Sequence, residues 1–147
     1  MNCMIDLTSI YLNKKMDDFL GKVYMELDLG SKGHAQFFTP YTISKMTAKM
    51  TLSSSQFENN KTLTMSEPAA GSGGMAIAAC DTLQEYNIDY KKQLRIIAQD
   101  INWNAVKMTY IQLSSINAQA HVVYGNTITH EEIAKYCTPE AIKSNWK

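Results

Sequence analysis

The chain has 147 residues, enough for one domain that buries its own core, and its 14 Lys and Arg balance its 14 Asp and Glu. This balance does not favour a protein that grips a nucleic acid duplex by itself, since such proteins usually carry a basic face. No apolar run approaches the ~20 residues that span a bilayer, and residues 1–6 lack the features of a secretion signal, so we expect a cytoplasmic protein with no membrane partner.

The first predicted element is an amphipathic helix within residues 1–29. Apolar residues recur at helical spacing from Leu12 to Leu27, and charged residues lie between them. We expect this helix to pack on its own domain, and docking onto a partner protein is the alternative. Gly30 and Gly33 predict the end of the helix and the start of a loop.

A second helix is predicted after the run Phe37-Phe38-Thr39-Pro40. Thr39 is expected to be its N-cap and Pro40 its first residue, since proline needs no N–H partner there. Ile43, Met46 and Met50 continue the helical pattern. The polar stretch at 53–61 predicts a connecting loop.

Three short apolar runs predict strands. They are Leu63 to Met65, Leu94 to Ala98 and His121 to Tyr124, and a helix from about Asn102 to Ile116 separates the last two. Strands that alternate with helices over such distances pair in parallel, with right-handed crossovers. We therefore expect an α/β fold with an open sheet that ends after three strands, and a helix or turn from His130.

A glycine-rich segment, Glu67-Pro68-Ala69-Ala70-Gly71-Ser72-Gly73-Gly74, follows the first strand and opens a helix-like run. Glycines let a ligand approach the backbone, and the first N–H groups of a helix attract anionic groups. Ligands of open parallel sheets lie outside the carboxyl ends of the strands. Because the glycine-rich segment, Asp100 and Asn126 each end one strand, the sequence predicts a nucleotide-like ligand at this edge.

Two nucleotide classes fit the segment poorly. A Walker loop needs Lys followed by Ser or Thr after its last glycine, and Met75 stands there instead. Gly71, Gly73 and Ala76 loosely match a dinucleotide fingerprint. Asp100 could then hold the ribose, so a dinucleotide-dependent oxidoreductase stays an alternative.

S-adenosylmethionine fits the same edge better. Glu67 would repel a pyrophosphate, but it suits the positively charged end of this molecule. The loop amides suit its carboxylate, Asp100 can accept from its ribose hydroxyls, and the amide of Asn126 can face the adenine edge.

Four motifs occur in a fixed order: Phe37-Phe38-Thr39-Pro40, the glycine-rich segment, Ala98-Gln99-Asp100-Ile101 and Gly125-Asn126-Thr127. In this combination the chain resembles the S-adenosylmethionine-binding half of adenine-specific DNA methyltransferases, most closely the modification subunits of type I restriction–modification systems. The resemblance covers about residues 34–129. It implies an open, mostly parallel sheet of the S-adenosylmethionine-dependent methyltransferase (Rossmann-like) type, truncated after the third strand.

The whole chain is expected to form one methyltransferase-like domain. Its parts would be the N-terminal helix (1–29), the cofactor-binding core (34–129) and a C-terminal segment (130–147).

The resemblance implies cofactor-binding residues from all four motifs: Phe38, Thr39, Pro40, Glu67, Ala69, Gly71, Gly73, Asp100, Ile101 and Asn126. The first motif would close over the methionine end, and the glycine-rich segment would lie beneath it. Asp100 would take the ribose hydroxyls, Ile101 would pack on the adenine face and Asn126 would contact the ring amine. The family commonly has Asp where Asn126 stands.

The family transfers its methyl group with an Asn/Asp-Pro-Pro-aromatic motif after a fourth strand. The three prolines here (Pro40, Pro68 and Pro139) are never adjacent, so we expect no catalytic residue in this chain. Methyl transfer would then need another chain that supplies this motif, and DNA would be bound only through such a complex. A second protein subunit or a homodimer is the expected partner, and whether this chain is itself an enzyme stays open. The alternative is an inactive binding or regulatory protein that docks onto a restriction–modification complex.

In the family's sheet the fourth strand pairs with the first. If the sheet ends after three strands, one flank of the first strand lacks a partner, and such edges tend to be covered. We expect the N-terminal helix, the segment 130–147 or a second copy of the chain to cover it.

No metal site is predicted. The three histidines and the three cysteines are scattered, without metal-ligand spacing, so we expect reduced thiols and structural or solvated histidines.

Overall fold

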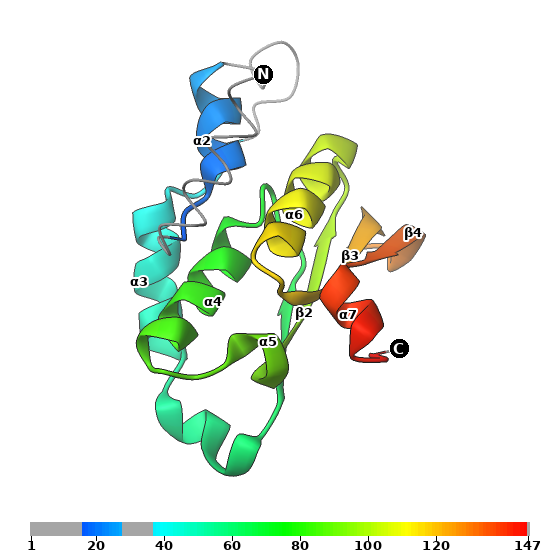
Figure 1. The fold of residues 1–147 in the computed structure, drawn as a ribbon. Coiled ribbons are helices and arrows are strands. Elements are labelled where there is room, and N and C mark those ends of the chain that lie inside the picture. Colours follow the sequence, from blue (N-terminus) through cyan, green and yellow to red (C-terminus); the bar gives the residue numbers. More distant parts are fainter. Residues whose placement is uncertain (1–15, 28–36, 147) are drawn as a thin grey trace.

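A four-stranded sheet organises the computed structural model, which describes residues 16–27 and 37–146 (Figure 1). In spatial order its strands are β1 (Leu63–Glu67), β2 (Leu94–Asp100), β3 (Gln119–Asn126) and β4 (Glu131–Cys137). The first three are parallel, and β4 runs antiparallel to β3. The prediction of an α/β fold with an open, mostly parallel sheet is confirmed, and the arrangement is consistent with a Rossmann-like fold.

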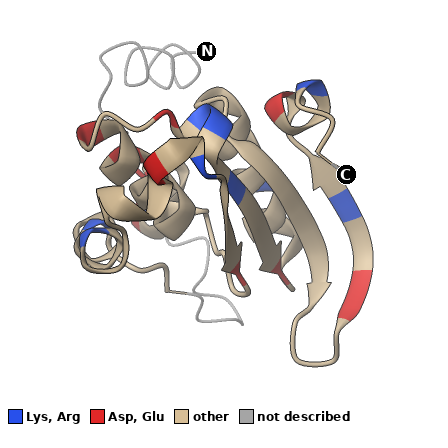
Figure 2. Ribbon diagram, turned by 90° about the horizontal axis from the view of Figure 1, so that it is seen from below, with Lys and Arg blue, Asp and Glu red and all other residues tan. Residues whose placement is uncertain are grey.

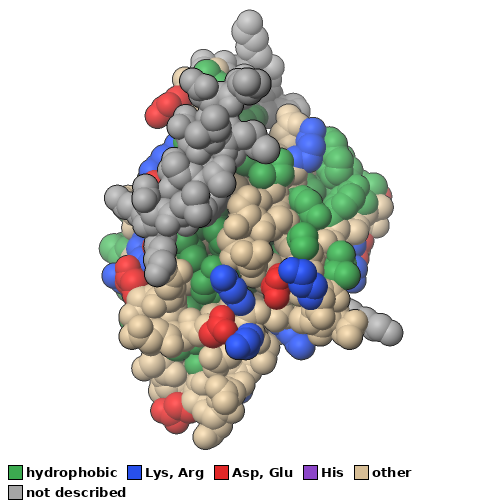
Figure 3. Space-filling view, viewed as in Figure 1, with side chains coloured by type: hydrophobic (Ala, Val, Ile, Leu, Met, Phe, Trp, Pro, Cys, Tyr) green, Lys and Arg blue, Asp and Glu red, His purple; other side chains and the backbone are tan. Residues whose placement is uncertain are grey.

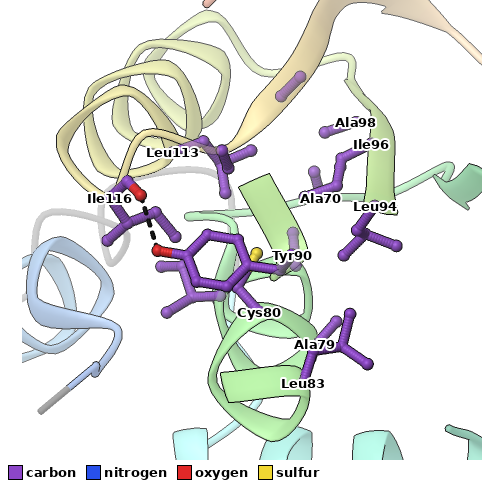
Figure 4. Close-up of a cluster of buried hydrophobic side chains, with 14 of the residues drawn as sticks. Ala70, Ala79, Cys80, Leu83, Tyr90, Leu94, Ile96, Ala98, Leu113 and Ile116 are labelled. Atoms are coloured by element: carbon purple, nitrogen blue, oxygen red, sulfur yellow. Dashed lines mark hydrogen bonds between the residues drawn. The ribbon is translucent and has the colours of Figure 1, made fainter. Parts of the chain in front are cut away.

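Helices α4 (Gly74–Glu85) and α6 (Trp103–Ser115) cover one face of the sheet and form the core with it. Along β2, the side chains facing these helices are buried while those between them are half-buried, as a period of two requires. Figure 4 labels core residues from both layers and from the loops between them: Ala70, Ala79, Cys80, Leu83, Tyr90, Leu94, Ile96, Ala98, Leu113 and Ile116. The Tyr90 hydroxyl donates to the Ile116 carbonyl at 2.8 Å and so pairs the one polar group of that ring.

The remaining helical elements are shorter or lie outside this core: α2 (Phe19–Glu26), α3 (Tyr41–Thr51), η1 (Ser54–Asn60), α5 (Tyr90–Gln93) and α7 (Pro139–Lys143). The stretch predicted as a loop at 53–61 therefore contains a short 3-10 segment. None of the described helices has both the length and the apolar character needed to cross a membrane.

Helix α3 packs along α4 through a polar network. Lys45 Nζ lies 2.6 Å from Asp81, and Lys49 Nζ lies 2.8 Å from Glu85. The Tyr41 hydroxyl also donates to Asp81 at 2.9 Å. These contacts fix the helix that follows the Phe-Phe-Thr-Pro run against the helix that follows the glycine-rich segment.

The predicted N-terminal helix is described only in part. Helix α2 covers Phe19–Glu26 and packs against α6, while residues 1–15 and 28–36 lie outside the described residues. Its N-cap is Asp18, whose side chain accepts a hydrogen bond from the Gly21 N–H.

The expectation that the sheet ends after three strands is wrong. A turn through His130, which has φ of 58°, leads into β4. This strand lies at the exposed edge of the sheet and carries charged residues such as Glu131, Glu132 and Lys135. Charged residues protect an edge strand from pairing with other chains, but they hide the alternation of apolar and polar residues by which a strand is recognised in a sequence. Thr138 then fixes the start of α7, because its hydroxyl donates to the Ala118 carbonyl at 2.7 Å.

One flank of β1 has no partner strand among the described residues. β4 lies at the opposite edge of the sheet, and Thr64 and Ser66 of β1 are exposed. The expectation that the segment 130–147 covers this flank is therefore wrong as far as that segment is described. The described part of the N-terminal helix packs on α6 instead, and coverage by a second copy stays a prediction.

Candidate functional site

The carboxyl ends of β1, β2 and β3 lie side by side at one edge of the sheet, because the three strands are parallel and in register. Glu67 at the end of β1 lies beside Ala98 of β2. After β3, the Thr127 hydroxyl donates to the Pro68 carbonyl at 2.7 Å, which joins the third strand end to the loop that follows the first. Figure 2 shows acidic residues at the tips of two neighbouring strands, consistent with Glu67 and Asp100.

The glycine-rich loop turns sharply from β1 into α4. Gly71 and Gly73 have φ of 58° and 95°, a region that residues with a side chain rarely adopt. A Cβ on Gly71 would lie 2.9 Å from the Phe38 ring, so the Phe-Phe-Thr-Pro run packs directly on this loop. Glycine is therefore required at position 71 both by conformation and by space.

Asp100 holds the loop from β2. Its carboxylate accepts one hydrogen bond from the Gly71 N–H and one from the Asn102 N–H, both at 2.8 Å, and the residue is only 6% exposed. Each of these bonds uses a different oxygen, and a carboxylate oxygen can accept two. Asp100 thus shapes the loop and keeps acceptor capacity for a ligand.

A cleft of about 280 Å³ lies beside this loop. Six of the predicted cofactor-binding residues line it: Phe38, Thr39, Glu67, Ala69, Gly71 and Asp100. Asp18 and Ser44, which the sequence did not single out, line it too. The structure therefore brings the N-terminal segment, the start of α3, the glycine-rich loop and the end of β2 to one hollow.

Four predicted residues are not among those that line the cleft: Pro40, Gly73, Ile101 and Asn126. The side-chain carbonyl of Asn126 accepts from the Ile128 N–H at 2.9 Å and thus stabilises the turn after β3. Ile101 follows β2 at the same edge and is 64% exposed. Gly73 forms the loop's second left-handed turn. Their roles toward a cofactor stay predictions.

The start of α3 differs from the prediction. Pro40 is the N-cap and the helix begins at Tyr41, without a side-chain cap from Thr39. Pro40 itself has an extended ψ of 136°, so the first helical residue is Tyr41 and Thr39 lies one position before the cap. Thr39 lines the cleft instead.

The cleft is acidic. Asp18, Glu67 and Asp100 line it, and no Lys, Arg or His is found among the described residues that do. Burial raises the pKa of Glu67, and a hydrogen bond from the Ala69 backbone partly offsets that rise. Carboxylates that are poorly solvated favour a ligand with positive charge and disfavour a pyrophosphate.

Asp18 is the most buried carboxylate of the cleft, at 3% exposed. It accepts hydrogen bonds from the Gly21 N–H and from the Ser72 hydroxyl of the glycine-rich loop. An N-cap pattern could have pointed to the first contact, because Asp is a favoured cap. Nothing local could have pointed to the second, because Asp18 and Ser72 are 54 residues apart in sequence.

Two titratable groups outside the cleft, Cys80 and His121, have structural surroundings. Among the described residues no group of three His, Cys, Asp or Glu side chains could hold a metal ion. Cys80 is fully buried in the core, and burial raises the pKa of its thiol. His121 stacks on Trp146 with ring centroids 3.8 Å apart, and burial lowers the pKa of its imidazole.

One comparison with known proteins gave a match. A family model described as N-6 DNA methylase matches residues 15–146, a range that contains all four motifs. No curated protein and no solved structure matched the chain. The resemblance to adenine-specific DNA methyltransferases is thus confirmed at the level of the family.

Proposed function

The chain belongs to the N-6 DNA methylase family, and on that premise we propose that it binds S-adenosylmethionine in the acidic cleft and takes part in methylating adenine in DNA. The observation that carries this proposal is the hydrogen bond from the Gly71 N–H to Asp100, because it joins the glycine-rich loop to the carboxylate expected to hold a ribose. The ends of β1 and β2 are thereby joined at the edge where ligands of open parallel sheets lie, which supports the proposal.

The charge of the cleft supports this ligand over a dinucleotide. S-adenosylmethionine carries a sulfonium, an ammonium and one carboxylate, and therefore one net positive charge. Glu67 would face its cationic end, while the backbone amides of the glycine-rich loop would face its carboxylate. Three carboxylates would instead repel the pyrophosphate of a dinucleotide.

The size of the cleft suggests how the ligand lies. Ligand pockets usually measure ~300–1,000 Å³, and this one, at about 280 Å³, is at the small end. We place the methionine end and the ribose inside it, and the adenine outside, against the exposed Ile101. Asn126 would then contact the adenine from the end of β3.

Methyl transfer would proceed in a complex. The Asn/Asp-Pro-Pro-aromatic motif that receives the target adenine in the family does not occur in this sequence. We propose that a different protein subunit supplies it together with the DNA-reading surface, in a cytoplasmic restriction–modification assembly. Trp103 of α6 and Ile133 and Tyr136 of β4 are exposed apolar residues. Figure 3 shows hydrophobic side chains gathered on the side of the molecule where α6 lies, and both observations support a role for a partner.

Calorimetry with the purified chain tests the cofactor. We expect S-adenosylmethionine to bind with micromolar affinity and NAD⁺ to give no heat of binding. Binding of NAD⁺ with no binding of S-adenosylmethionine would support the oxidoreductase alternative and refute the proposal. Cofactor binding without methyl transfer, even in the presence of the partner that co-purifies with the chain, would favour the regulatory alternative.

A further inference from the structure

Asp18 joins three separate elements at the wall of the cleft. Its carboxylate accepts from the Gly21 N–H of α2 at 3.0 Å, from Gln112 Nε2 of α6 at 2.8 Å, and from the Ser72 hydroxyl of the glycine-rich loop. These three bonds leave the carboxylate with one unused acceptor position, since two bonds use Oδ1 and one uses Oδ2.

Two glycines make room for this carboxylate. A Cβ added to Gly21 would clash with Asp18 Oδ2, and one added to Gly74 would lie 2.9 Å from the same oxygen. Gly74 is the first residue of α4. The carboxylate therefore sits between the starts of α2 and α4, in a space that larger residues at either position would fill.

Gln112 completes the arrangement from α6, where it is fully buried. Its Nε2 also donates to the Ser72 carbonyl at 2.8 Å, and its Oε1 accepts from the Leu20 N–H at 3.1 Å. Ser72 is thus held by both its hydroxyl and its backbone. Since Ser72 lies between the two left-handed glycines, fixing it fixes the loop that would receive the ligand.

An independent observation indicates that a ligand belongs in this part of the cleft. Ser44 of α3 lines the cleft and is 1% exposed, yet its hydroxyl has no hydrogen-bond partner among the described residues. Buried hydroxyl groups in native proteins are normally paired. A polar group of a bound ligand would supply the missing partner.

Building on the proposed function, we propose that Asp18 is a positioning residue of the cofactor site, which fixes the glycine-rich loop through Ser72 and biases the cleft toward the cationic cofactor. S-adenosylhomocysteine, the product of methyl transfer, lacks the sulfonium charge and is neutral overall. A carboxylate shielded from water discriminates between two such molecules more strongly than one in bulk solvent. Asp18 thereby favours exchange of the spent product for new cofactor.

The substitution Asp18→Asn tests this, because it keeps the size of the side chain and removes its charge. Calorimetry should compare S-adenosylmethionine with S-adenosylhomocysteine on the wild type, on Asp18→Asn and on Asp89→Asn, a control at the exposed N-cap of α5. We expect Asp18→Asn to reduce the affinity for S-adenosylmethionine by about tenfold and the affinity for S-adenosylhomocysteine by about threefold or less. The control substitution should change neither affinity. Unchanged binding, or an equal loss for both ligands, would overturn the inference.

Ser72→Ala separates the effect of loop position from the effect of the Asp18 charge. It also tests the inference if circular dichroism shows that Asp18→Asn is unfolded. Ser72→Ala removes one donor to Asp18 and keeps every carboxylate of the cleft. We expect the affinities for both ligands to fall by a similar factor of about three to ten, so that the preference for S-adenosylmethionine is kept. Wild-type affinity in Ser72→Ala would overturn the inference while leaving the proposed function intact, whereas a wild type that does not bind S-adenosylmethionine would refute both.

Discussion

The carboxylate of Asp100 accepts a hydrogen bond from the Gly71 N–H at 2.8 Å, although the two residues are 29 positions apart. This bond joins the end of β2 to the glycine-rich loop after β1, and Asp100 and the loop together line the acidic cleft. One residue thus shapes the loop and offers acceptors to a ligand.

Removing this carboxylate should weaken cofactor binding. We expect Asp100→Ala to reduce the affinity for S-adenosylmethionine by ~1–3 kcal/mol, because the ribose hydroxyls lose their acceptor and the Gly71 N–H loses its partner. Calorimetry measures the change, and Asp89→Ala, in a helix cap away from the cleft, should leave affinity unchanged. An Asp100→Ala variant with wild-type affinity would remove this residue from the site.

The loop should not tolerate a side chain at position 71. Gly71→Ala places a Cβ in a left-handed conformation and against the Phe38 ring, so we expect a loss of ~1–3 kcal/mol in the free energy of unfolding. Urea denaturation provides the value. Asn87→Ala is the matched control, because Asn87 has φ of 58° in the turn after α4. Its loss in the free energy of unfolding should be smaller than that of Gly71→Ala. An equal loss would show that the contact of position 71 with Phe38 adds nothing.

Cofactor affinity should rise with pH. Burial raises the pKa of Glu67, so this carboxyl takes up a proton at a higher pH than an ordinary glutamate does. Because a cationic ligand favours the ionised form, binding should strengthen as pH rises through that raised pKa. Calorimetry between pH 4.5 and pH 8 should show affinity increasing with pH in the wild type, and increasing less steeply in Glu67→Gln, which keeps Asp18 and Asp100. An identical pH dependence in the two proteins would contradict a role of Glu67 in binding the cationic end of the cofactor.

The same group should affect the unliganded protein in the opposite sense. A carboxyl whose folded-state pKa is raised contributes stability that is fully present below its unfolded pKa and is lost as pH rises through the folded pKa. We therefore expect the free energy of unfolding of Glu67→Gln to increase relative to that of the wild type as pH rises above the pKa of an ordinary glutamate. Urea denaturation at several pH values gives the difference, and a constant one would argue against a raised pKa.

The contact between α3 and α4 should contribute to stability through Tyr41. Tyr41→Phe removes the hydroxyl that donates to Asp81 at 2.9 Å, and we expect a loss of about 1 kcal/mol in the free energy of unfolding. Tyr86→Phe serves as control, because among the described residues the Tyr86 hydroxyl donates no hydrogen bond. Thermal and urea denaturation of both variants should show the loss only in Tyr41→Phe.

Much of the site could be predicted because its signals are local. Glu67 and Asp100 stand at the ends of apolar strands, and parallel strands bring such ends together at one edge. Glycines between a strand and a helix indicate a turn that needs left-handed conformations, which Gly71 and Gly73 adopt. Order along the chain was thus enough to place these residues near one another.

Other features depend on contacts that no local pattern reveals. The bond between Asp18 and Ser72 spans 54 positions, and it makes the segment before α2 part of the cleft. The strand β4 escaped prediction because its charged residues, suited to an exposed edge, hide the alternation of a strand. Asn126 ended the expected strand, yet its side chain is engaged in the turn that follows.

Nuclear magnetic resonance of the isotopically labelled chain, titrated with S-adenosylmethionine, shows whether the cofactor binds beside the glycine-rich loop. If the cofactor binds in the acidic cleft, the backbone amide signals of Gly71, Ser72 and Asn102 should shift on binding. Amides remote from the cleft, such as that of Asn117 after α6, should stay in place. Saturable binding that leaves the amide signals of Gly71, Ser72 and Asn102 unchanged, or no binding at millimolar cofactor, would refute binding in the acidic cleft.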